Sequence, residues 1–191
     1  MSNRAWLVLD LAVKAALIGL LLVAVAFPDA EQFQGKAMGG RAATYPIATV
    51  IVPAIWFFFF RRSPYPYAAD ILVVLPFLID TVGNALDLYD SVSWWDDANH
   101  LVNWAILVTG FGTLIVRLPI GRLNAAALAL GFGAVTHILW ELGEYLAFIR
   151  DNPEEFRTAY TDTIGDLALS LAGSAIGAAI TGWVLWREPR S

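Results

Sequence analysis

Residues 5–27 read AWLVLDLAVKAALIGLLLVAVAF, an apolar run with only two charged side chains, Asp10 and Lys14. An α-helix needs about 20 mostly apolar residues to cross a bilayer, so the run predicts a membrane-spanning helix. Asp10 and Lys14 are four residues apart, and we expect an ion pair within the helix. The run also resembles a cleavable signal peptide, because an arginine precedes it and small residues end it. We nevertheless expect the segment to be retained as the first span.

Five further apolar stretches follow at residues 46–60, 69–89, 97–117, 123–149 and 162–186. The 191-residue chain is 58% hydrophobic and only 15% charged, whereas soluble domains are about 25% charged. The stretches are continuous and lack the alternation of a transmembrane β-barrel. The sequence therefore predicts an all-α, polytopic membrane helix bundle of about six transmembrane helices, forming a single domain over residues 1–191.

The composition also excludes several classes of partner and chemistry. The net charge is −5 and no cluster of Lys and Arg is present. This argues against a nucleic-acid partner, because binding its phosphates needs clustered Lys and Arg side chains. The chain has no cysteine, so disulfides, thiolate metal sites and a cysteine nucleophile are excluded. Membrane lipids are the expected surroundings, and any chemistry falls to histidine and carboxylates.

The basic residues predict the orientation, because Lys and Arg near span ends favour the cytoplasmic side. With both termini cytoplasmic, seven basic residues lie inside and four lie outside. The inner ones are Arg4, Arg61, Arg62, Arg117, Arg122, Arg187 and Arg190, and the outer ones are Lys36, Arg41, Arg150 and Arg157. We interpret residues 28–45 as an outer connector, with a lid over a site as the alternative.

Polar residues inside the last four predicted spans are the most informative feature. A charged side chain within a span costs about 2.5–3.5 kcal/mol on insertion scales and usually faces the bundle interior. Helical spacing places each set on one face, and the sets are Asp80, Asn84 and Asp87; Asp96, His100 and Asn103; His137, Glu141 and Glu144; and Asp162, Asp166 and Ser170. Under the predicted topology, most of these acids and His100 lie at the outer ends of four helices.

Several carboxylates packed near one histidine need a compensating cation or shared protons. A divalent metal ion is one such cation, because these ions bind carboxylate oxygens and imidazole. We predict His100, Glu141, Glu144, Asp162 and Asp166 as metal ligands, Asp96 as a catalytic residue that orients His100, and Asp80, Asn84 and Asp87 as substrate-binding residues. The alternatives are a functional network of protons or salt bridges and a purely structural network. We interpret the deeper His137 as an interhelical donor.

Three segments resemble a known family in their order and spacing. Asp96-x-x-x-His100, Trp140-Glu141-x-x-Glu144, and Asp162-Thr163-x-x-Asp166 followed by Gly173 are similar to the signature segments of the YjdF-like bacterial inner-membrane proteins. They are more loosely similar to the VanZ-like family, and the resemblance covers about residues 76–178. It implies a multi-pass protein of the bacterial inner membrane with a polar site, and the VanZ-like family, linked to glycopeptide resistance, implies a role in the cell envelope.

Three functions are compatible with these patterns. The leading hypothesis is an outer-face site that acts on, or binds, the polar part of a lipid or lipid-linked envelope molecule. The second is a proton or ion relay, and the third is an accessory subunit of a larger membrane complex. Gly173 and Gly177 form a small-xxx-small face, which is typical of a contact with a partner helix.

Overall fold

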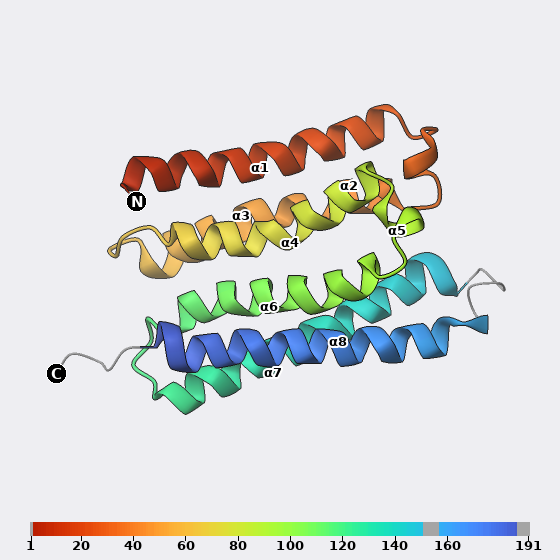
Figure 1. The fold of residues 1–191 in the computed structure, drawn as a ribbon. Helices are drawn as coiled ribbons and strands as arrows, with labels where there is room; N and C mark the ends of the chain where they lie inside the picture. The colour runs from red at the N-terminus through yellow and green to blue at the C-terminus, as the bar shows by residue number, and fades with distance from the viewer. Residues whose placement is uncertain (1, 151–156, 187–191) are drawn as a thin grey trace. The chain divides into compact units, whose positions relative to one another are not determined.

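The computed structural model describes residues 2–150 and 157–186, and these residues are helical with no strand (Figure 1). Six of the helices are long and apolar enough to cross a membrane. They are Asn3–Ala26, Met38–Phe60, Tyr67–Ala85, Trp95–Ile115, Arg122–Ala147 and Ala159–Leu185. The predicted all-α fold with six spans is therefore confirmed. Arg187 and Arg190, used in the orientation argument, lie outside the described residues.

The chain divides into two compact units, Met1–Ser93 and Trp94–Ser191, which we call unit 1 and unit 2. Unit 1 contains α1 (Asn3–Ala26), the short helices η1 (Glu31–Phe33) and α2 (Met38–Thr44), α3 (Pro46–Ile55), η2 (Trp56–Phe60), α4 (Tyr67–Ala85) and α5 (Leu88–Ser91). Within this unit α4 packs against both α1 and α3. The prediction of one domain over residues 1–191 stays a prediction.

The second span begins at Met38, eight residues earlier than the sequence predicts. Glycines in the 28–45 segment favour a loop, yet α2 runs over Gly39 and Gly40, and Pro46 then occupies the first turn of α3. Proline is well accommodated there because the first amides of a helix have no partner within it. The second half of the predicted loop is therefore helical.

Two ion pairs attach the 28–45 segment to the rest of unit 1. Lys36 Nζ lies 2.7 Å from Asp90 Oδ2 on α5, and Arg41 Nε lies 2.9 Å from Asp80 Oδ2 on α4. The hydrogen bond from Lys36 lowers the pKa of the Asp90 carboxyl below its ordinary value. The segment is thus anchored at both of these contacts.

The third span ends at Ala85, before the end predicted at residue 89. Asp87 has a φ of 57°, in the left-handed region that aspartate tolerates better than most residues. The side chain of Asp87 is exposed. Asp80 and Asn84 share a buried helical face as predicted, but the prediction that Asp87 continues this face is wrong.

Unit 2 is built from three long helices. They are α6 (Trp95–Ile115), α7 (Arg122–Glu144), which continues as the π-helix η3 (Tyr145–Ile149), and α8 (Ala159–Ala179), which continues as η5 (Ile180–Leu185). α6 and α8 share the most extensive contact, and α7 packs against both (Figure 1). Val108, Ala129 and Ala178 belong to the apolar core between them.

Glycine allows α6 and α8 to approach at backbone distance. A Cβ atom at Gly173 would overlap the Leu101 carbonyl oxygen, and one at Gly177 would lie 2.9 Å from the Ala105 carbonyl oxygen. Small residues permit such close packing between membrane helices. The Gly173/Gly177 face thus contacts α6 of the same chain, and a partner outside the chain stays a prediction.

Candidate functional site

His100 is the centre of a polar cluster in unit 2. It lies on α6, one turn after Asp96, and only 6% of its surface is exposed. Its Nε2 atom lies 3.8 Å from Asp96 Oδ1 and 3.5 Å from Asp166 Oδ1 on α8. One edge of the imidazole therefore faces two carboxylates from two different helices.

The other edge of the imidazole faces α7 and α8. His100 Nδ1 lies 3.0 Å from the hydroxyl oxygen of Ser170 and 3.8 Å from Glu141 Oε1. Ser170 is fully buried, and it follows Asp166 by one helical turn. A proton on Nδ1 would donate to Ser170 and leave the Nε2 lone pair directed at Asp96 and Asp166. Metal-binding histidines commonly have this arrangement, with the second nitrogen fixed by a hydrogen bond.

Two overlapping sets of side chains have the composition of a metal site. One set is Asp96, His100 and Asp166, and the other is His100, Glu141 and Glu144. In each set, one ligand atom from every residue lies within 4.8 Å of the others. Two bonds of about 2.1 Å at a tetrahedral angle place donor atoms about 3.4 Å apart, so the 3.5 Å contact between His100 and Asp166 needs little adjustment.

Glu141 contains a buried oxygen that lacks a donor. Glu141 is 8% exposed, and its Oε1 atom has no hydrogen-bond partner among the described residues. Buried polar atoms nearly always have a partner, which can be water or an ion. This oxygen lies on the Nδ1 edge of His100, so only an ion or a water molecule on that edge would contact it.

Five of the six predicted metal-site and catalytic residues thus meet in one cluster: Asp96, His100, Glu141, Glu144 and Asp166. Asp162 is exposed at the start of α8 and belongs to neither ligand set. Asp96 lies at ligand distance instead of behind His100, so the structure supports a direct contact with an ion as much as an orienting role.

His137 lies one turn below Glu141 on α7. Its ring packs edge-on against Trp104, with centroids 5.8 Å apart, and it is buried. His137 Nδ1 has no hydrogen-bond partner within the described part of the chain. Its predicted role as an interhelical donor stays a prediction.

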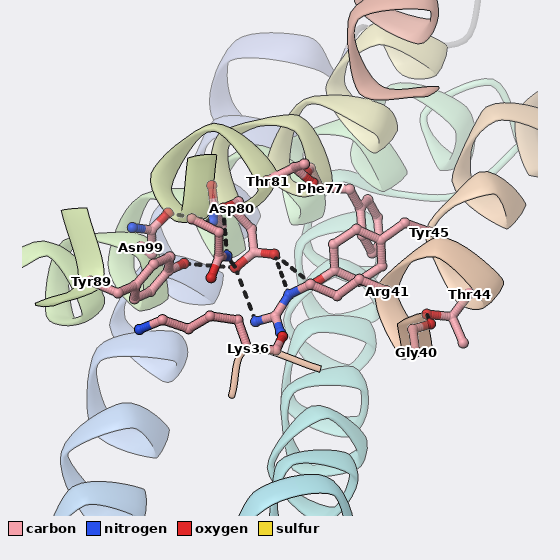
Figure 2. A network of polar contacts seen from close by, with 12 residues as sticks. Lys36, Gly40, Arg41, Thr44, Tyr45, Phe77, Asp80, Thr81, Tyr89 and Asn99 are labelled. Carbon is pink, nitrogen blue, oxygen red and sulfur yellow. Dashed lines mark hydrogen bonds and ion pairs between the residues drawn. The ribbon is translucent and has the colours of Figure 1, made fainter. Parts of the chain in front are cut away.

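The predicted substrate-binding residues Asp80 and Asn84 belong to unit 1 and form a different network (Figure 2). Asp80 Oδ2 accepts from Arg41 Nε at 2.9 Å and from the Tyr45 hydroxyl at 2.7 Å. Asp80 Oδ1 accepts from the Tyr89 hydroxyl at 2.7 Å and from Asn84 Nδ2 at 3.4 Å. Both carboxylate oxygens therefore have donors from the protein itself, which is the pattern of a structural acid.

Sequence reasoning missed two partnerships in unit 1. Arg41 appeared to be a loop residue, and no local sequence pattern links it to Asp80, with which it pairs. The Asp10–Lys14 pair is confirmed at 3.2 Å, but Lys14 also binds Asp70 at 2.5 Å. Asp70 stands in the first turn of its span, where an acid is unremarkable.

One family model matches the chain over residues 11–187, and its description is "Predicted membrane protein (DUF2238)". No curated protein and no solved structure matches the chain. The family match covers all six spans in whole or in large part. The chain therefore belongs to the DUF2238 family of membrane proteins.

Proposed function

We propose that unit 2 of this multi-pass membrane protein holds a divalent metal ion and uses it on the polar part of a lipid or lipid-linked envelope molecule. His100 Nε2, Asp96 and Asp166 would hold the ion on one edge of the imidazole, and Glu141 and Glu144 lie against the other edge. A metal there supplies Lewis-acid chemistry, by polarising a phosphoryl or ester oxygen or by activating water.

The buried oxygen of Glu141 carries this proposal. It lacks a hydrogen-bond donor, it lies 3.8 Å from a histidine nitrogen, and the groups that surround it are themselves acidic. Water alone would give it a donor but would leave the excess negative charge in place. A divalent cation at His100 supplies the compensating charge.

The placement of the site along the helices supports a substrate from the membrane surface. α6 begins at Trp95 and α8 at Ala159, whereas α7 ends at Glu144, so the cluster lies at one end of unit 2. With both termini cytoplasmic, that end faces outward, where lipid head groups are in reach. The resemblance to YjdF-like proteins supports the bacterial inner membrane as the location.

A relay across the membrane is less well supported by the same helices. Below the cluster, unit 2 closes on the apolar core that contains Val108, Ala129 and Ala178. A chain of proton carriers needs polar groups or water through the whole span. A site open at one end fits these contacts better.

The metal content of the purified protein tests the proposal through two acids on one helix. Asp166 and Asp162 are one turn apart on α8, but only Asp166 belongs to a ligand set. We expect elemental analysis to find about one divalent ion per wild-type chain, a loss of most of it in Asp166→Asn, and its retention in Asp162→Asn. Asp97→Asn, an exposed neighbour of Asp96, is the second control.

The measurements test the bound ion and the lipid substrate separately. Background metal content in the wild type after growth and purification with added Mn²⁺, Zn²⁺ or Mg²⁺ would contradict the metal. Equal loss of metal in the Asp162 and Asp166 variants would indicate that the ion responds to the overall negative charge and not to a defined set of ligands. Lipids that copurify with the wild type should include a species that Asp166→Asn loses, and an identical lipid profile would contradict the lipid substrate.

The outward orientation has its own test, because the chain has no native cysteine. We expect cysteines introduced at Ser2 and Ser191 to react with an impermeant maleimide only after the membrane is opened. A cysteine at Ser93, which is exposed just before α6, should react in intact cells. The reverse pattern would place the cluster at the cytoplasmic face and exclude an outer-leaflet substrate.

A further inference from the structure

A second group of buried charges lies in unit 1, where α1 packs against the start of α4. Lys14 Nζ lies 3.2 Å from Asp10 Oδ2 and 2.5 Å from Asp70 Oδ2. The Tyr65 hydroxyl also donates to Asp70 Oδ2. Asp10 is 4% exposed and Asp70 is 0% exposed, so both acids share one ammonium group away from solvent.

The charges of this group do not balance. Two carboxylates and one ammonium leave one excess negative charge inside a membrane-spanning segment. Tyr65 and the neighbouring Tyr67 carry phenol groups, and α3, which also packs on α4, contains no ionisable residue. α2 packs on α1, but its one base, Arg41, pairs with Asp80. Burying an uncompensated carboxylate is costly enough that such a group normally binds a proton or finds a partner.

The hydrogen bonds of the group are also incomplete. All the donors meet Oδ2 atoms, whereas Asp10 Oδ1 and Asp70 Oδ1 are buried and have no partner within the described residues. One proton would remove the excess charge and turn one of the two unpartnered oxygens into a donor.

Asp80 in the same unit gives a direct comparison. It pairs with Arg41, a single base for a single acid, and both of its oxygens accept hydrogen bonds. The Asp80 pair is therefore neutral and complete without a proton. The Asp10, Lys14 and Asp70 group differs in both respects.

We propose that Asp10 and Asp70 share one bound proton at neutral pH, and that together with Lys14 they form a proton-binding site within the membrane. A metal cation is a poorer ligand for this site, since it would have to lie beside the Lys14 ammonium. Tyr65, only partly buried in the connection before α4, connects Asp70 to the surface of unit 1 and gives the proton a route of exchange.

Infrared spectroscopy of the full-length protein in detergent tests the site, because a protonated carboxylic acid absorbs apart from a carboxylate. At pH 7 we expect Asp10→Asn and Asp70→Asn each to remove one equivalent of carboxylic acid from the wild-type spectrum. Asp80→Asn should leave the carboxylic acid absorption unchanged. Acids of unit 2 contribute equally to all these spectra and cancel in the differences.

A lysine variant should change the carboxylic acid absorption in the opposite direction, so a general loss caused by poor folding cannot explain both results. Lys14→Met removes the only base, so both acids should bind protons and the spectrum should gain one equivalent. The proposal is overturned if neither aspartate variant changes the carboxylic acid absorption, or if Asp80→Asn removes it. It is equally overturned if NaCl, added at constant pH in place of choline chloride, abolishes the wild-type signal, because the ligand would then be sodium.

Discussion

Replacing Arg41 with methionine is expected to lower the free energy of unfolding by about 3–5 kcal/mol. The change removes the cation that pairs with Asp80 and leaves behind a buried carboxylate that is 6% exposed. Tyr45 and Tyr89 still donate to Asp80, but a hydrogen bond does not cancel a buried charge. Unfolding by sodium dodecyl sulfate in mixed micelles, followed by circular dichroism, measures the loss.

A double variant identifies the cause of that loss. Arg41→Met combined with Asp80→Asn has no charge to compensate, and the one amide oxygen of Asn can still accept from one of the two tyrosines. We expect it to recover at least half of the stability lost in Arg41→Met. If the double variant is as unstable as the single one, the packing of the arginine side chain, and not its charge, stabilises unit 1.

Replacing Gly173 with alanine is expected to destabilise unit 2 by about 1–3 kcal/mol, the usual cost of overpacking. The new methyl group would meet the Leu101 carbonyl oxygen, which is backbone and cannot rotate away as a side chain can. α8 would have to move away from α6, and Asp166 and Ser170 would move with it. We therefore expect metal content to fall together with stability.

Gly165 on the same helix is the matched control. An alanine Cβ there meets no atom within 4 Å, so Gly165→Ala should gain about 0.5–1 kcal/mol from its better helix propensity. Thermal unfolding of the two variants, monitored by circular dichroism in the same detergent, should shift in opposite directions. Equal destabilisation of both would mean that glycine flexibility, not close approach, is required in α8.

The spans and the cluster in unit 2 were predictable because their signals are local. Continuous apolar runs identify membrane helices, and the spacing of Glu141 and Glu144 or of Asp96 and His100 places each pair on one helical face. Insertion cost then directs these faces inward. Five of the residues selected in this way share the ligand sets around His100.

The remaining features depend on contacts between distant segments or on single backbone torsions. Nothing local distinguishes Arg41 as the partner of Asp80, since its glycine-rich surroundings favour a loop. The end of α4 depends on the left-handed torsion of Asp87, which a period of 3.6 residues does not reveal. Asp162 and Asp166 lie on the same face of the predicted helix. Only the packing of α8 against α6 and α7 makes Asp166 buried and leaves Asp162 exposed.

The glycine contacts of α8 bear on which ion the proposed site would accept. A Cβ at Gly133 of α7 would overlap Ser174 of α8, much as one at Gly173 would overlap α6, so all three helices are in close register just below His100. Helices packed this closely would resist the widening needed to provide the six to eight oxygens at about 2.3–2.6 Å that Ca²⁺ requires. The proposed site would therefore favour small ions with few, short bonds, and ionic radius would be the property by which it discriminates among divalent metals.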